Sequence, residues 1–327
     1  MSGQYLDLYN GSTANGTNVI QNKYSGNSSQ RWKAVYLGGG MYKIVSALDN
    51  TKALTVAGSS GANGLNIYIS TFTNSVTQRF SIERKTDYTC KVLSNASNYI
   101  GGMTVQAPVF DEGANVYQMT YNGTHNDEWL FEIYSPAYYK SEGIRYAMAN
   151  YDNYLVTYPN LSNFNNSGND CANFVSQCLA AGGKRYNANW YVYKKNTTYI
   201  APQNSTQLDH TWELSDPSPW ISAKKFGYYW SDYATHDTFT PQQIINNNSA
   251  TATAYGKGDV VQILKHDSFW SDFIGFHTMY VTDVTDSSNK NTFKMTYHSA
   301  NTLERRLLYI CSEYNSSNYR FRFYKMV

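Results

Sequence analysis

The sequence predicts two domains of different fold class: an all-β domain over residues 1–135 and an α+β domain over residues 136–327. The first prediction rests on three repeats of short alternating strands separated by clusters of Gly, Asn and Ser. The second rests on a change to helical periodicity after residue 136, followed by separate strands. A chain of 327 residues is long enough for each domain to bury its own core.

An aromatic residue marks the same place in each repeat of the first domain. Trp32, Phe80 and Trp129 follow one another at spacings of 48 and 49 residues. In the first two repeats, Gln30 and Gln78 stand two positions before the aromatic residue. We expect the rings to pack in a shared core and the glutamines to bond to nearby backbone, so these positions are predicted to be structural.

Three units with this signature resemble the ricin-type β-trefoil, a family of carbohydrate-binding modules, and the resemblance implies a β-trefoil for residues 1–135. Sugar pockets of the family combine an acid, an aromatic residue and amides. The first repeat keeps only the acid, Asp7, with Asn22 at the aromatic position and Ser29 at an amide position. None of the three pockets matches. The module is therefore expected either to bind another glycan through its tyrosines or to serve for docking and spacing.

The α+β domain is predicted to begin near Tyr134-Ser135-Pro136, where the periodicity changes. A helix is expected over residues 140–151, with Ile144, Ala147, Met148 and Tyr151 on one face. Strands are expected farther along the chain, over residues 259–263, 278–282 and 293–297.

A second helix is expected to start at Cys171, capped by Asp170, and to end at Gly182-Gly183. Unpaired N–H groups and partial positive charge at a helix start favour a thiolate, so we expect the pKa of Cys171 to lie below its usual value of about 8.5. His277, at the start of a later strand, is the expected base. His298, at the end of the next strand, is expected to bond the far nitrogen of His277 and fix its tautomer. This pattern predicts a cysteine hydrolase.

The Cys171 segment, Asp-Cys-Ala-Asn-Phe-Val-Ser-Gln, together with His277-Thr-Met-Tyr-Val-Thr and Tyr297-His298-Ser299, resembles an amidase domain family of the papain-like cysteine clan. NlpC-type and CHAP peptidoglycan hydrolases are related to it. The resemblance spans about residues 140–325 and implies a papain-like α+β fold. It implies Cys171 as nucleophile and His277 as base, with His298 or Asn301 in the third position.

Composition excludes several other classes. A net charge of +2 with scattered Lys and Arg argues against a nucleic-acid partner. No apolar run approaches the roughly 18 residues of a transmembrane helix, and no export signal is expected within the chain. Four dispersed cysteines predict free thiols. No cofactor is expected, and no metal site, because paired Cys or His elements at metal-binding spacing are absent.

We therefore expect a cysteine-dependent amidase or peptidase that acts through a thioester acyl-enzyme. Peptidoglycan stem peptides are the expected substrate, because bacterial walls join sugar and amide in one polymer, and the trefoil would hold the enzyme on glycan. A secreted or cell-surface bacterial location follows from that substrate. Two alternatives stay open: a secreted toxin or effector that binds host glycans and carries a cysteine protease or deamidase, and a non-enzymatic glycan-binding adhesin.

Overall fold

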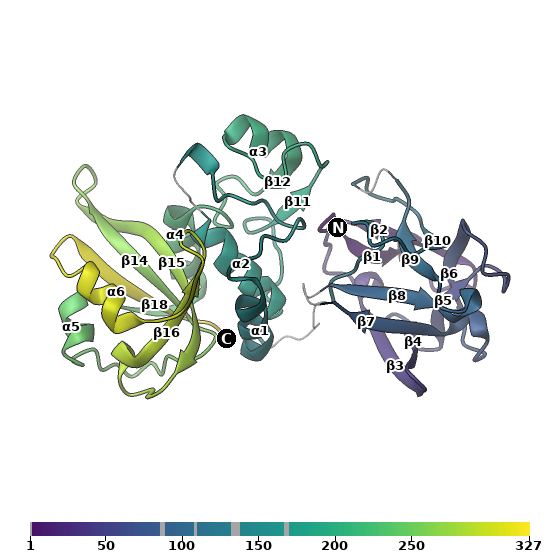
Figure 1. Cartoon of the computed structure of the whole chain (residues 1–327), viewed down its shortest axis with the longest axis horizontal. Helices are drawn as coiled ribbons and strands as arrows, with labels where there is room; N and C mark the ends of the chain where they lie inside the picture. Colours follow the sequence, from purple (N-terminus) through teal and green to yellow (C-terminus); the bar gives the residue numbers. More distant parts are fainter. Residues whose placement is uncertain (1, 86–88, 108–109, 132–137, 167–169) are drawn as a thin grey trace. The chain divides into compact units, whose positions relative to one another are not determined.

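A computed structural model describes residues 2–85, 89–107, 110–131, 138–166 and 170–327 (Figure 1). The chain forms two compact units, Met1–Phe131 with Tyr193–Thr197, and Glu132–Val192 with Thr198–Val327. The boundary expected at Tyr134-Ser135-Pro136 lies outside the described residues. Within these residues, no helix is long and apolar enough to cross a membrane.

The first unit is built from β-strands, as predicted, and its strands pair antiparallel. The strands are β1 (Tyr5–Leu8), β2 (Thr17–Asn22), β3 (Trp32–Gly38), β4 (Met41–Ser46), β5 (Lys52–Val56), β6 (Leu65–Thr71), β7 (Phe80–Arg84), β8 (Cys90–Ser94), β9 (Gly101–Val105) and β10 (Val116–Thr120). Their order is β1-β2-β6-β10-β9-β8-β7-β4-β3, and β5 pairs with β4 and β6. Short 3-10 helices lie at Tyr9–Gly11, Ser28–Gln30, Val76–Gln78 and Asn95–Ser97.

The structural role predicted for the repeated glutamines is confirmed. The side-chain amide of Gln30 donates to the carbonyl of Lys23 (2.7 Å), and its oxygen accepts from the N–H of Ser25 (2.8 Å). Gln78 makes the equivalent bonds seven and five residues back (2.9 and 2.7 Å). Phe80 is fully buried. The repeat therefore encodes turns fixed by amide side chains around one core.

Three asparagines close a ring of hydrogen bonds at equivalent places in the repeats. Nδ2 of Asn18 donates to Oδ1 of Asn115 (2.8 Å), Asn115 donates to Asn66 (2.9 Å), and Asn66 donates to Asn18 (2.9 Å). Each side chain thus gives one bond and receives one. The ring ties the three repeats together.

The second unit combines helices with a six-stranded antiparallel sheet of order β13-β18-β14-β15-β16-β17. The sheet strands are β13 (Thr235–Phe239), β14 (Val260–Asp267), β15 (Asp272–Val284), β16 (Phe293–Tyr297), β17 (Thr302–Arg306) and β18 (Tyr319–Lys325). The helices are α1 (Lys140–Asn150), α2 (Cys171–Ala181), α3 (Ser205–Thr211), α4 (Ala223–Tyr233), α5 (Pro241–Ile245) and α6 (Leu307–Glu313). A short strand, β12 (Trp212–Leu214), and 3-10 helices at Phe164–Asn166 and Lys290–Thr292 complete the described elements of this unit. Another short strand, β11 (Val192–Lys194), begins at the last residue before the segment Tyr193–Thr197, which belongs to the first unit.

Figure 1 shows α5 and α6 on one side of this sheet and α1, α2 and α4 on the other. Alternate residues of the central strands, among them Val261 and Met279, pack with Leu307 and Ile310 of α6 in one apolar cluster. The predicted change to an α+β architecture is confirmed, as are the helix that ends at Gly182-Gly183 and the three expected strands.

The face predicted for the first helix is confirmed only in part. Ala147 is fully buried, but Met148 is exposed, and the side that packs inward also carries Gly143, Tyr146 and Asn150. A Cβ on Gly143 would lie 2.2 Å from the hydroxyl of Tyr280, so only glycine permits this approach. Close backbone contact and polar anchors, rather than aliphatic side chains, decide which side of α1 faces the core.

Candidate functional site

Helix α2 runs through the interior of the second unit. Every residue from Cys171 to Ala180 is buried, and Cys171 occupies the first helical position with 6% of its surface exposed. The predicted start of this helix is confirmed. The thiol, however, lies at the edge of the protein interior rather than in an open cleft.

Burial controls the charge of this thiol. Desolvation raises the pKa of Cys171 to about 11, although hydrogen bonding from the backbone of Thr278 acts in the opposite direction. The predicted lowering of this pKa is therefore wrong for the resting protein. Loss of hydration destabilises the thiolate more than the N–H groups and partial charge at the helix start stabilise it. Cys171 is a neutral thiol at neutral pH.

His277 lies one residue before Thr278, inside β15 and not at the start of the strand as predicted. Its ring meets the ring of Tyr297 edge-on, with centroids 4.7 Å apart. Although the residue is partly exposed, burial lowers the pKa of His277 to about 4. In the described part of the chain, its ring nitrogens make no hydrogen bond. The imidazole is therefore neutral at neutral pH, and burial opposes its protonation.

The bond expected between His298 and His277 is wrong, because both ring nitrogens of His298 have other partners. Nδ1 faces a carboxylate oxygen of Asp170, and Nε2 lies 2.8 Å from the backbone oxygen of Asn150. His298 and Asp170 are both fully buried. His298 therefore links the start of α2 to the end of α1.

The partners of His298 fix the proton count of this pair. The backbone oxygen of Asn150 only accepts, so Nε2 of His298 carries a proton. A second proton lies between Nδ1 and the carboxylate of Asp170. Whichever atom holds it, the pair has no net charge, and this lowers the cost of burying it.

Asp170 precedes α2 as predicted, but its carboxylate does not cap the helix. Its second oxygen, Oδ1, accepts from the N–H of Leu161 (2.9 Å) and from the side chain of Asn173 (2.8 Å). The backbone N–H of Asp170 donates to the hydroxyl of Ser299 (3.2 Å). Asp170 thus connects the loop at Leu161, helix α2 and the end of β16 by hydrogen bonds. A capping interpretation of Asp170 missed its contact with His298.

The ring of His298 lies between two aromatic side chains, Phe174 at 4.2 Å and Tyr154 at 4.3 Å between centroids. The hydroxyl of Tyr154 donates to Oδ1 of Asn301 (2.8 Å). Asn301, the alternative third catalytic residue, is therefore bonded to Tyr154 and not to His277.

The other polar residues around Cys171 are also internal anchors. Oδ1 of Asn173 accepts from the indole of Trp220 (2.9 Å), and the hydroxyl of Ser176 donates to the carbonyl of Trp220 (3.0 Å). Gln177 accepts from the hydroxyl of Tyr146 (2.7 Å). The polar pattern of this segment therefore fixes α2 within its domain.

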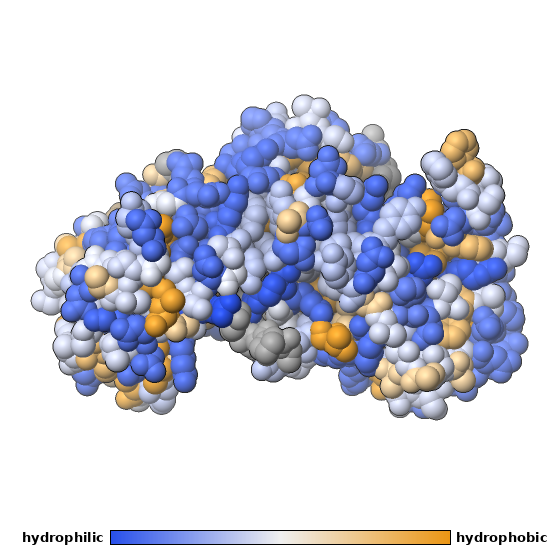
Figure 2. Space-filling model, turned by 180° about the vertical axis from the view of Figure 1, so that it is seen from behind, coloured by the Kyte–Doolittle hydropathy of each residue, from blue (hydrophilic) through white to orange (hydrophobic). Residues whose placement is uncertain are grey.

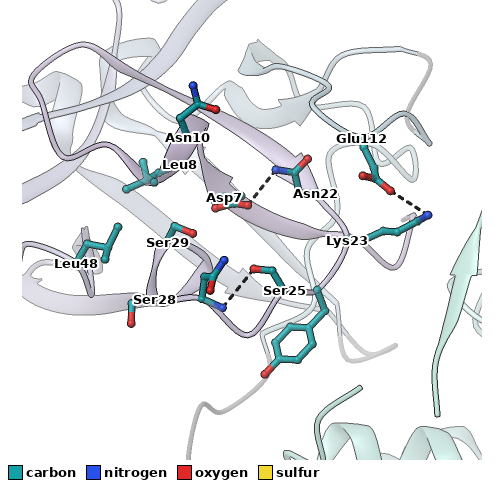
Figure 3. Close-up of a pocket in the computed structure, with 13 residues that line it drawn as sticks. Asp7, Leu8, Asn10, Asn22, Lys23, Ser25, Ser28, Ser29, Leu48 and Glu112 are labelled. Carbon is teal, nitrogen blue, oxygen red and sulfur yellow. Dashed lines mark hydrogen bonds and ion pairs between the residues drawn. The ribbon is translucent and has the colours of Figure 1, made fainter. Parts of the chain in front are cut away.

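A second candidate site is a pocket of about 710 Å³ in the first repeat of the β-unit (Figure 3). One carboxylate oxygen of Asp7 accepts from Asn22 (3.0 Å) and Gln30 (3.2 Å), and the other is buried without a partner. Lys23 and Glu112 form an ion pair at 2.9 Å in the pocket wall. Asn22 and Ser29 lie in the lining, as their sequence positions suggested.

Solved structures that match part of this chain include designed and natural proteins. ThreeFoil, a designed threefold symmetric protein, is 35% identical over 39% of this chain and 90% of its own, with a TM-score of 0.38. An exo-β-1,3-galactanase from Clostridium thermocellum is 27% identical over 39% of this chain, with a TM-score of 0.36. The Rhizoctonia solani agglutinin is 22% identical over 40% of this chain and 94% of its own, with a TM-score of 0.34.

The chain spans only 27% of the galactanase and 16% of a mosquitocidal holotoxin that it also matches. No curated protein matches the chain.

Two family models match, one for each unit. Residues 1–70 and 28–119 match the family described as Ricin-type beta-trefoil lectin domain-like, so the all-β unit is a β-trefoil. Residues 137–324, more than half of the chain, match the family described as Putative amidase domain. The chain therefore belongs to this amidase domain family.

Proposed function

We propose that this chain is a cysteine-dependent amidohydrolase with Cys171 as nucleophile and His277 as base, in an α+β domain of the papain-like type. One observation carries the proposal. Helix α2, which begins at Cys171, packs against β15, the strand that carries His277, and hydrogen bonding from the backbone of Thr278 lowers the pKa of the thiol against the effect of burial. The two proposed residues therefore lie on packed elements, and membership of an amidase family supports the same type of reaction.

In the first step, Sγ of Cys171 attacks the carbonyl carbon of the amide while His277 takes the thiol proton. Both groups are neutral at rest, so the proton moves during the attack and not before it. The imidazolium then protonates the departing amine nitrogen, and a thioester remains on Cys171. Water, deprotonated by the neutral His277, hydrolyses the thioester to a carboxylate and a free thiol.

Backbone groups stabilise the negative charge that develops in these steps. Hydrogen bonding from the backbone of Thr278, Ala172 and Cys171 lowers the pKa of the thiol against the effect of burial. Amides at a helix start point outward and favour negative charge. The N–H of Cys171 is the first oxyanion donor in this proposal.

His298 serves as a positioning residue in this mechanism. Its nitrogens are engaged by Asp170 and Asn150, so it holds the segment that precedes Cys171 and does not orient His277 directly. Tyr297 contacts the ring of His277 and restricts its orientation.

We propose peptide bonds of the peptidoglycan stem as the substrate, and a secreted or cell-surface bacterial location. An amidase domain and a lectin-like trefoil in one chain suit a polymer that joins sugar and amide. The glycan would enter the Asp7 pocket, whose lining includes the polar side chains of Asn10, Asn22 and Ser28. Position 22 carries no aromatic residue, but the ring of Tyr24 lies in the pocket lining and offers a face on which a sugar can stack.

A non-enzymatic adhesin is the second candidate, and the state of the thiol favours it. A cysteine that is buried and protonated at neutral pH can be a packing residue on a hydrolase scaffold. Such a protein would bind wall glycan through its trefoil and cleave nothing.

Purified bacterial cell walls test the two candidates. The amidohydrolase should lower the turbidity of a wall suspension, and Cys171→Ala should abolish this activity while the protein still binds the walls. Mass spectrometry of the soluble products should show new amino termini in stem peptides. The matched control is Cys178→Ala, a second buried thiol on α2, which should keep the activity. Full digestion by Cys171→Ala would refute the cysteine mechanism, and wall binding without digestion by the wild type would favour the adhesin.

A further inference from the structure

The β14–β15 hairpin ends in two exposed aromatic side chains. Phe269 is 82% exposed and Trp270 is 66% exposed, and their rings lie edge to face with centroids 5.0 Å apart. The hairpin extends beyond the sheet in Figure 1, and its end stands clear of the surrounding surface in Figure 2. Burial of a large aromatic side chain removes a large apolar area from water, which is favourable. An exposed aromatic pair at a protruding tip therefore indicates a surface that binds a partner.

Side chains of the turn itself hold the pair in place. Oδ1 of Asp267 accepts from the N–H groups of Phe269 (2.9 Å) and Trp270 (3.4 Å). Oδ1 of Asp272 accepts from the N–H of Phe273 (2.7 Å). These backbone donors are therefore satisfied without water, which is a condition for placing backbone in a nonpolar phase. The two rings are presented by an ordered turn.

Two cationic side chains lie behind the tip. Lys265, two residues before the end of β14, places its Nζ 5.7 Å from the ring centre of Phe276. The guanidinium of Arg320 on β18 lies 4.4 Å from the ring centre of Phe273. Long cationic side chains in this place reach phosphate groups while the aromatic end enters the nonpolar layer.

We propose that this tip docks on a phospholipid bilayer, with Phe269 and Trp270 inserted at the membrane interface. The two rings, packed edge to face, form a protruding wedge, whereas a sugar site needs a concave surface with converging polar groups. An indole suits the headgroup level, because it has an apolar body and one polar N–H. Two carboxylates in the turn balance the two cations, so aromatic insertion and not lipid charge drives the binding. The proposal is independent of any catalytic role of Cys171.

Co-sedimentation of the full chain with phosphatidylcholine vesicles tests this proposal. The wild type should partition to the vesicles, with a blue shift of tryptophan emission. The double variant F269S/W270S should lose at least about tenfold in partitioning, because the buried aromatic area is removed. Raising the salt from about 0.1 M to about 0.5 M should change wild-type binding by less than about twofold, since the local charges cancel.

The control is Tyr233→Ser, an equally exposed aromatic residue on α4, which should bind vesicles like the wild type. Circular dichroism checks the fold of each variant. If the double variant unfolds, the single variant Phe269→Ser takes its place and should show a smaller loss of partitioning. A wild type that stays in solution overturns the proposal. A double variant that binds vesicles as well as the wild type also overturns it. The same holds if the double variant loses binding to wall polysaccharide but keeps binding to vesicles.

Discussion

Asp170 and His298 form a fully buried pair that shares one proton and joins the segment before Cys171 to the end of strand β16. The carboxylate also receives the N–H of Leu161 and the side chain of Asn173. Every hydrogen-bonding atom of the pair is engaged. Such a buried network stabilises the fold only when all its members are paired, because a polar group that loses its partner stays buried without water as a substitute.

Substitution of Asp170 should show whether this pair is ionic. Asp170→Ala leaves His298 and the N–H of Leu161 unpaired, and we expect a loss of about 3 to 5 kcal/mol in the free energy of unfolding. In Asp170→Asn, the new amide can donate to Nδ1 of a neutral His298 while its oxygen keeps the other bonds. The loss should then be about 1 kcal/mol.

Urea unfolding followed by tryptophan fluorescence measures both losses at pH 7. The control is Asp152→Ala, an exposed carboxylate just after α1. Equal losses in the Ala and Asn variants would contradict a neutral alternative for the pair and would assign the second proton to an imidazolium.

Alkylation of Cys171 should follow the pKa of a buried thiol. With a pKa of about 11, the thiolate fraction rises with pH over the whole neutral and alkaline range. The rate of iodoacetamide labelling should therefore increase about tenfold per pH unit between about pH 7 and about pH 10. Mass spectrometry of the Cys171 peptide gives this rate. A rate that is already constant at about pH 6 would instead indicate a thiolate held by an imidazolium of His277.

Acid should destabilise the second unit through His277. The pKa of His277 is about 4 in the folded state, below its ordinary value of 6.5, so between these values the unfolded chain binds more protons. Stability is thus complete above pH 6.5 and falls as the pH drops toward 4. The loss amounts to at most about 3 kcal/mol, less where solvent reaches the ring.

The variant His277→Gln isolates this effect. It should show a flatter dependence of the unfolding free energy on pH between 4 and 6.5 than the wild type. His236→Gln, at an exposed histidine of β13, should leave the dependence unchanged. An unchanged slope in His277→Gln would place the acid sensitivity in another group.

The architecture could be predicted because its signals, a repeated spacing and the periodicity of short segments, are visible in the sequence without knowledge of contacts. The 48- and 49-residue spacings predicted the three repeats. The apolar run after Cys171 predicted a helix that ends at Gly182, and the helix does end there. The position of Cys171 at a helix start came from the same kind of signal.

The charge states and pairings could not be predicted, because they depend on burial and on partners distant in sequence. Asp170 was expected to cap α2, yet its carboxylate meets His298, which lies 128 positions away. The thiol of Cys171 was expected to ionise, yet desolvation is the largest influence on it. Asn18, Asn66 and Asn115 repeat at the spacing of the aromatic residues, a signal that was present and could have indicated contact.

The asparagine ring should contribute to the stability of the trefoil in a non-additive way. Asn66→Ala removes two of the three bonds and leaves Oδ1 of Asn18 and Nδ2 of Asn115 without their partners. We expect this variant to lose about 1 to 2 kcal/mol, since the side chains are only partly buried. The triple Ala variant should lose less than the sum of the three single losses, because bonds shared by two side chains are counted twice in the sum. Urea unfolding of the four variants measures these values, with Asn50→Ala, an exposed turn residue, as control. Strict additivity would show that the three amides act separately and that the ring adds nothing to the coupling between repeats.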